Sequence, residues 1–195
     1  MIKINLTGDI GSGKTYISSL FRTPCFSADT EVRRLYKNNR NCFLKLKKKF
    51  PNFIKTFPVN KVELSNVIKS KVSNLKDIGL IIHPLIRKKL RNFLNKNKNK
   101  KIVVLDIPLY LENKMNKKND IIIFLKTKKK DANERLKKRK NFNPKILKIL
   151  RKSQFSLKQK KIKSNYILVN NYNSEIMKKK VKMLNQKILN DRSSS

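Results

Sequence analysis

The chain has few of the residues on which several classes of protein depend. It contains no tryptophan, one histidine, two cysteines and four glycines among its 195 residues. Two cysteines cannot build a disulfide framework, and a single histidine adds too little for a His/Cys metal centre. No uncharged apolar run approaches the ~20 residues of a membrane span, and the start MIKINLTGDI lacks the apolar segment of a secretory signal. The composition therefore predicts a soluble, cytoplasmic protein without a membrane partner.

Acidic residues are scarce as well. Twelve Asp and Glu stand against 50 Lys and Arg, which gives a formal net charge of +38. Lysine, asparagine and isoleucine have codons rich in A and T and make up 85 of the 195 residues, so we expect drift in genome composition, rather than a selected partner, to be the main cause of the excess. A basic surface attracts polyanions, but the basic runs here are lysine and no nucleic-acid-binding module surrounds them. We therefore expect no specific nucleic acid partner.

Short apolar runs alternate with helical patterns along the chain. Five segments are expected strands because they are β-branched or continuously apolar: 1–7, 24–27, 102–105, 121–125 and 166–169. Apolar residues at helical spacing occupy most of the intervals, notably 61–75, 85–94, 131–140, 144–163 and 174–189. This alternation predicts an α/β fold, in which a parallel sheet carries helices on both faces.

The segment from Gly8 to Thr15 indicates the chemistry. It reads GDIGSGKT, matches the pattern G-x-x-x-x-G-K-[ST], and lies between an expected strand and an expected helix. Such a loop wraps a nucleoside triphosphate with backbone N–H groups, while its lysine reaches the β- and γ-phosphates and its threonine hydroxyl holds Mg²⁺. The residues expected to contact ATP are Gly8, Gly11, Ser12, Gly13, Lys14, Thr15 and Tyr16.

Several segments together resemble the dephospho-CoA kinase family. Residues 6–15 are similar to the family's first strand and phosphate loop, with Asp9 where the family usually has glycine. Residues 27–29 (SAD) resemble its Asp-Ala-Asp, 82–87 (IHPLIR) its His-Pro helix entry, and 106–113 (DIPLYLEN) its Asp-x-Pro-Leu-Leu-x-Glu segment. A last match joins Arg135, Arg139, Arg151 and Gln154 to residues 165–171. The resemblance covers about residues 1–175 and implies a P-loop kinase that phosphorylates the 3′-hydroxyl of the ribose of dephospho-coenzyme A.

The resemblance also implies roles at the ends of two expected strands. Asp29 is expected to take the proton of the attacking hydroxyl and to contact the acceptor, with a helix N-cap as the alternative. Asp106 is expected to hold Mg²⁺ through water together with Thr15, with a strand-end carboxylate that binds no metal as the alternative. Ser27 replaces the family's first aspartate, which leaves open how metal or ribose is held there.

The remaining site residues follow from the same resemblance. Acceptor contacts are expected from Asp29, His83, Arg87, Pro108, Leu109 and Glu112. For His83 the alternative is a structural role at a helix entry before Pro84, and for Glu112 it is the start of a helix. Arg135 and Arg139 are four residues apart and should share one face of a lid helix over the triphosphate. Arg139 would stabilise the transferring phosphoryl group, Asn170 would contact ATP, and a solvated basic face is the alternative for both arginines.

We expect one P-loop kinase domain over residues 1–191. Its core would comprise 1–49, 100–128 and 164–191, with an acceptor-binding helical insertion at about 50–95, a lid at about 129–163 and a disordered tail at 192–195. The expected small molecules are ATP, Mg²⁺ and dephospho-coenzyme A, and the expected state is a monomer. Three alternatives stay open: a nucleoside or nucleoside-monophosphate kinase, a basic nucleic-acid-binding NTPase, and a family member without activity.

Overall fold

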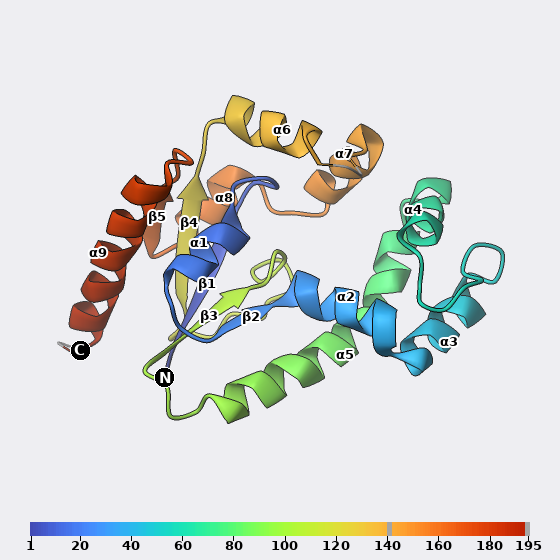
Figure 1. Ribbon diagram of the computed structural model, residues 1–195, viewed down its shortest axis with the longest axis horizontal. Helices are drawn as coiled ribbons and strands as arrows, with labels where there is room; N and C mark the ends of the chain where they lie inside the picture. The colour runs from blue at the N-terminus through green and yellow to red at the C-terminus, as the bar shows by residue number, and fades with distance from the viewer. Residues whose placement is uncertain (140–141, 194–195) are drawn as a thin grey trace. The chain divides into compact units, whose positions relative to one another are not determined.

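The chain divides into two compact units. The computed structural model describes residues 1–139 and 142–193 (Figure 1). The first unit, here called the sheet unit, consists of Met1–Ser27, Asn99–Phe142 and Gln154–Ser195. The second, here called the helical unit, consists of Ala28–Lys98 and Asn143–Ser153.

Five parallel strands form the centre of the sheet unit, in the order β2-β3-β1-β4-β5. They are β1 (Ile2–Gly8), β2 (Cys25–Ser27), β3 (Ile102–Asp106), β4 (Ile121–Lys126) and β5 (Tyr166–Val169). Strand β1 pairs with β3 in the register Ile4↔Val104 and with β4 in the register Leu6↔Ile123. Strands β2 and β3 lie on one side of β1, and β4 and β5 lie on the other. An open α/β sheet binds ligands at the carboxyl ends of the strands where the strand order reverses in this way.

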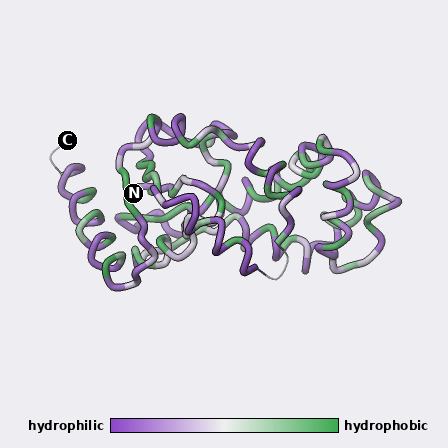
Figure 2. The backbone as a smooth tube through the Cα atoms, turned by 90° about the horizontal axis from the view of Figure 1, so that it is seen from above, coloured by the Kyte–Doolittle hydropathy of each residue, from purple (hydrophilic) through white to green (hydrophobic). Residues whose placement is uncertain are grey.

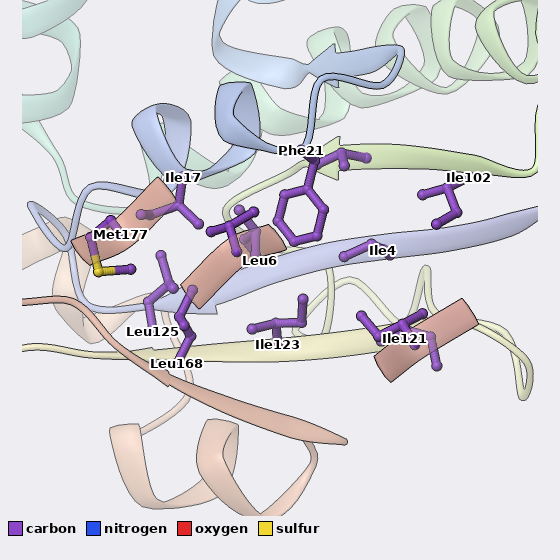
Figure 3. Packing of buried hydrophobic residues seen from close by; sticks show 13 residues of the cluster. Ile4, Leu6, Ile17, Phe21, Ile102, Ile121, Ile123, Leu125, Leu168 and Met177 are labelled. Carbon is purple, nitrogen blue, oxygen red and sulfur yellow. The ribbon is translucent and has the colours of Figure 1, made fainter. Parts of the chain in front are cut away.

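Helices α1 (Lys14–Leu20), α6 (Lys129–Lys137), α8 (Leu157–Ile162) and α9 (Ser174–Ser193) complete the sheet unit. Figure 3 shows the core, in which Ile17 of α1 and Met177 of α9 pack against Leu6, Ile123 and Leu168 of the strands. Hydrophobic and hydrophilic stretches alternate along α9 (Figure 2), the pattern of a helix that buries one face. This packing anchors α1 and fixes the far end of the loop that leaves β1.

The helical unit comprises α2 (Ala28–Asn38), α3 (Arg40–Lys49), α4 (Lys61–Ser70), α5 (Asn74–Lys96) and α7 (Pro144–Lys152). Asparagine side chains begin three of these helices. The Asn39, Asn60 and Asn143 carboxamide oxygens accept hydrogen bonds from backbone N–H groups of α3, α4 and α7, respectively. Each bond satisfies one of the donors that a helix start leaves without a partner.

The expected helix entry at His83-Pro84 is wrong, because α5 runs through this dipeptide. Proline removes one helical donor and costs about 3 kcal/mol inside a helix. Ile78, Ile82 and Ile86 stay buried at four-residue spacing on either side of it. Burying side chains of this size contributes about 1.5–3 kcal/mol each, so packing outweighs the proline.

Two other expected helices are broken. The segment 61–75 ends its first helix at Ser70, and the next begins at Asn74. The segment 144–163 divides into α7 and α8 because Ser156 and Gln159 form a capping box, in which each side chain bonds the other residue's backbone N–H. A pair of this kind is typical of a helix N-terminus.

The units also divide the chain differently from the expected segments. Residues 28–49, expected in the core, and residues 143–153, expected in the lid, belong to the helical unit. The reason is packing, since α2 and α3 contact α5, and α7 contacts α4. Arg192 and Ser193, expected in the tail, belong to α9, while Ser194 and Ser195 lie outside the described residues, as do residues 140–141 of the expected lid.

Within residues 1–139 and 142–193, no helix combines the length and the apolar composition that crossing a bilayer requires.

Candidate functional site

The loop between β1 and α1 depends on its glycines. Gly11 and Gly13 have φ of 89° and 87°, in the left-handed region that side chains oppose. Neighbours also leave no room for a side chain. A Cβ would lie 2.9 Å from the carbonyl oxygen of Ala132 at position 11 and 2.8 Å from Asn170 Nδ2 at position 13. A backbone of this form turns successive N–H groups toward an anion, as the sequence motif predicts.

Lys14 lies with its ammonium on the loop itself. Its Nζ donates to the carbonyl oxygen of Asp9 at 2.8 Å and lies 3.5 Å from both the Gly8 carbonyl oxygen and Ser12 Oγ. These acceptors are neutral. A triphosphate in the loop would offer the ammonium anionic oxygens, which attract it more strongly than these uncharged oxygens do.

Thr15 and Asp106 meet at the carboxyl ends of β1 and β3. The Thr15 hydroxyl donates to Asp106 Oδ2 at 2.7 Å, and Asp106 is buried as the last residue of β3. A hydroxyl and a carboxylate oxygen at this separation are hard ligands that suit Mg²⁺, an ion that keeps several of its waters. The two residues therefore fit the predicted metal site. No group of three His, Cys, Asp or Glu in the described part of the chain could hold another metal.

The charge of Asp106 also acts on a neighbouring thiol. Cys25 is exposed, but partial desolvation of its thiol, first, and the Asp106 carboxylate, second, raise the pKa of Cys25 to about 11. Cys25 begins β2, which pairs with β3. A thiol with this pKa is almost entirely protonated at neutral pH, so Cys25 is not a reactive nucleophile.

Asn170 and Tyr172 hold the loop from the carboxyl end of β5. The buried Asn170 carboxamide donates to the Ser12 carbonyl oxygen at 2.8 Å and accepts from the Tyr172 N–H at 2.9 Å. The Tyr172 hydroxyl donates to the Gly11 carbonyl oxygen at 3.2 Å, and the Arg135 guanidinium lies 4.6 Å above the tyrosine ring. Asn170 thus supports the loop through the protein's own backbone, and its contact with ATP stays a prediction.

The expected arginine pair does not share a helical face. Arg135 lies in α6, but α6 ends at Lys137, and Arg139 belongs to the turn that follows. Both side chains are exposed. The helix stops short of the expected boundary because the N–H of Arg139 bonds the Leu136 carbonyl oxygen, three residues back, in a closing turn. Their roles at the triphosphate stay predictions.

The segment after β3 forms turns rather than the helix start expected at Glu112. Glu112 Oε1 accepts from the N–H of Phe155 at 2.9 Å and pairs with Lys160 Nζ at 3.3 Å. Pro108 and Leu109 lie in the same turns and are partly buried. Motif reasoning missed Lys160 and Tyr172, because neither belongs to a local pattern and lysine is the commonest residue of the chain.

Three expected site residues belong to the helical unit. Asp29 is exposed in the first turn of α2, which begins at Ala28, so it is not the helix N-cap. His83 and Arg87 are exposed one turn apart on α5. Gly79 leaves space for the imidazole, since a Cβ there would lie 3.2 Å from His83 Cε1. Partial desolvation of the ring by its neighbours, and then the Arg87 charge, lower the pKa of His83, which keeps the ring mainly neutral at pH 7.

Comparison with known proteins decides which kind of kinase carries this loop. The family model described as Dephospho-CoA kinase matches residues 2–176. The chain belongs to the dephospho-CoA kinase family. Among its relatives, the dephospho-CoA kinase of Bartonella henselae is 32% identical over 170 residues, which cover 85% of this chain and 87% of that protein. The family match extends over both the sheet unit and the helical unit.

Solved structures confirm the predicted fold. The Thermus thermophilus protein TT1252 superposes with a TM-score of 0.77 at 21% identity, over 97% of each chain. The dephospho-CoA kinase from Campylobacter jejuni superposes with a TM-score of 0.63 at 21% identity, over 95% of this chain and 96% of that one. The α/β kinase fold with its five-stranded parallel sheet is therefore common to this chain and to a structurally characterised dephospho-CoA kinase.

Proposed function

We propose that this chain transfers the γ-phosphoryl group of ATP to the 3′-hydroxyl of the ribose of dephospho-coenzyme A. The products are ADP and coenzyme A, and the reaction is the last step of coenzyme A synthesis. The observation that carries the proposal is a family match over residues 2–176 in a chain whose phosphate loop is intact. A cytoplasmic location and a monomeric state stay predictions.

Lys14 and the loop backbone would bind the triphosphate. The Lys14 ammonium lies against carbonyl oxygens of the loop itself, next to the backbone that would bind the β- and γ-phosphates. Asp9, which stands where the family usually has glycine, turns its carboxylate to the N–H of Ile10 at 2.7 Å. Because the side chain is held by the loop's own backbone, this departure from the family pattern is compatible with activity.

Thr15 and Asp106 would hold Mg²⁺, which supplies positive charge to the phosphate oxygens when it is bound. The chain's own part is to keep the two oxygen ligands together at the carboxyl ends of β1 and β3. Ser27, which replaces a family aspartate, pairs with Asp106 in the sheet register. The serine therefore lies at the same strand ends and brings no charge of its own there.

Asp29 would accept the proton of the attacking hydroxyl, and Arg139 would stabilise the transferring group. A carboxylate within hydrogen-bond reach of a hydroxyl acts as a general base, which contributes about 10²–10⁴-fold to the rate. Arginine binds phosphate oxygens through two parallel N–H bonds, which suits Arg135 and Arg139 to the triphosphate. The proposal is supported by the exposure of all three side chains.

The acceptor would be held by His83, Arg87, Pro108, Leu109 and Glu112. His83 is mainly neutral at pH 7, so its ring both donates and accepts a hydrogen bond, while Arg87 carries the charge for an acceptor phosphate. The two apolar side chains would contact the uncharged part of the acceptor.

The test is ADP release from Mg-ATP with dephospho-coenzyme A, nucleosides, nucleoside monophosphates or polynucleotide as the second substrate. The proposal predicts release with dephospho-coenzyme A alone. Lys14→Met should abolish it, and Lys158→Met, which removes an exposed lysine of α8, should leave it unchanged. Release driven by another small acceptor would overturn the substrate, and stimulation by polynucleotide alone would overturn the small-molecule kinase.

A further inference from the structure

Lys160 is a buried cation beneath the phosphate loop. It belongs to α8, a helix that packs against β1, and its side chain is 1% exposed. Its Nζ donates to Gln154 Oε1 at 2.6 Å and to the Gly8 carbonyl oxygen at 3.3 Å, and it pairs with Glu112 Oε1 at 3.3 Å. All three donors of the ammonium thus have an acceptor.

The ion pair of Lys160 with Glu112 is not expected to stabilise the fold much. Glu112 is also nearly buried, with 9% of its side chain exposed, and its Oε2 has no hydrogen-bond partner. The desolvation of two buried charges offsets most of their attraction, and apolar residues of similar volume usually serve a core as well or better. Burial lowers the pKa of Lys160, although the Glu112 charge opposes the shift.

Besides its ion pair with Glu112, Lys160 contacts the backbone of the phosphate loop at Gly8. Gly8 is the last residue of β1 and the first of the phosphate loop. Its carbonyl oxygen has two ammonium groups within 3.5 Å, those of Lys14 and Lys160. The Lys14 contact, at 3.5 Å, is the longer of the two and would be given up if Lys14 turned to the triphosphate as proposed. Lys160, at 3.3 Å, is also held by Gln154 and Glu112.

We infer that Lys160 is a positioning residue of the phosphate loop, which holds the Gly8 carbonyl in place when Lys14 moves to the triphosphate. The inference rests on the proposed use of ATP by this loop. Lys160 also ties the loop to the turn after Asp106 through Glu112, and to the chain before α8 through Gln154. One ammonium thereby links the start of the phosphate loop to the turns that follow the proposed metal ligand Asp106.

The test separates this role from simple neutralisation of Glu112. Lys160→Met leaves a buried carboxylate without a counter-charge and should lower the melting temperature strongly. The double variant Lys160→Met/Glu112→Gln removes both charges, and its melting temperature should return close to that of the wild type. If Lys160 positions the loop, the double variant still binds Mg-ATP at least tenfold more weakly by isothermal titration. The matched control Lys158→Met should bind as the wild type does.

A second variant covers the case in which the double variant does not fold. Lys160→Arg keeps the charge beside Glu112, but a planar guanidinium cannot reproduce the three-way donation of an ammonium. We expect a melting temperature above that of Lys160→Met, because the charge beside Glu112 is kept, and at least threefold weaker Mg-ATP binding than the wild type. Wild-type affinity in Lys160→Arg, or in the folded double variant, would overturn the inference. Failure of the wild type to form coenzyme A would overturn the proposed function and leave these affinities to be judged separately.

Discussion

Replacing Gly11 with alanine should destabilise the protein, because the loop allows neither the backbone angle nor the space. The left-handed φ of 89° costs a residue with a side chain about 1–2 kcal/mol. The new Cβ would lie 2.9 Å from the Ala132 carbonyl oxygen and 2.9 Å from Leu136 Cγ, and overpacking of this kind costs about 1–3 kcal/mol. Alanine also lowers the conformational entropy of the unfolded chain, which offsets about 0.4–1 kcal/mol of this loss. The net loss is on the order of 2–3 kcal/mol.

The assay is thermal unfolding followed by circular dichroism. For a chain of this size, 1 kcal/mol shifts the melting temperature by about 2–4 °C, so Gly11→Ala should lower it by about 5–10 °C. Gly79→Ala is the matched control, since Gly79 lies in α5 and its added Cβ would meet a side chain, the His83 ring, at 3.2 Å. Alanine is the better helix former by about 0.5–1 kcal/mol, which offsets the displaced ring. A Gly11→Ala protein as stable as Gly79→Ala would refute the reasoning.

Three further predictions concern Asp106, Cys25 and Asp29. Asp106→Asn should lower kcat with Mg-ATP by about 100-fold and raise the Mg²⁺ concentration needed for half-maximal rate, because the charged one of the two proposed oxygen ligands becomes neutral. An unchanged Mg²⁺ dependence would show that Asp106 does not hold the ion. Alkylation of Cys25 by iodoacetamide should rise about tenfold per pH unit up to about pH 11, and it should be faster at pH 8 in Asp106→Asn because the carboxylate that helps to raise the thiol pKa is gone. Asp29→Asn should reduce kcat by about 10²–10⁴-fold with little change in the KM for ATP, while Glu31→Gln in the same helical turn should be nearly neutral; equal effects of the two would exclude Asp29 as the base.

The strands could be predicted from the sequence because burial on both faces leaves a local signal. Residues 166–169 form β5 as expected, and β3 and β4 extend one residue beyond the expected 102–105 and 121–125. The helix boundaries around Pro84 could not be predicted in the same way. There the outcome depends on tertiary packing of the neighbouring isoleucines, which outweighs a strong local signal for a break.

The phosphate loop could likewise be predicted, because its conformation depends on the glycines, lysine and threonine within eight consecutive residues. The side chains that hold the loop could not. Lys160 reaches Gly8 across 152 residues of sequence and Tyr172 reaches Gly11 across 161, so the contacts exist only once the sheet has formed. Lys160 is one of 40 lysines, and nothing in its spacing or in the neighbouring residues marks it as buried.

The measurement that tests the central claim most directly is the identity of the product. The purified protein is incubated with Mg-ATP and dephospho-coenzyme A, and the acceptor is analysed by mass spectrometry and ³¹P NMR. The account predicts an acceptor heavier by one phosphoryl group, with a new monoester resonance at the ribose 3′ position and one ADP formed per coenzyme A. Unchanged dephospho-coenzyme A in the presence of bound ATP, or a phosphoryl group at another position, would contradict it.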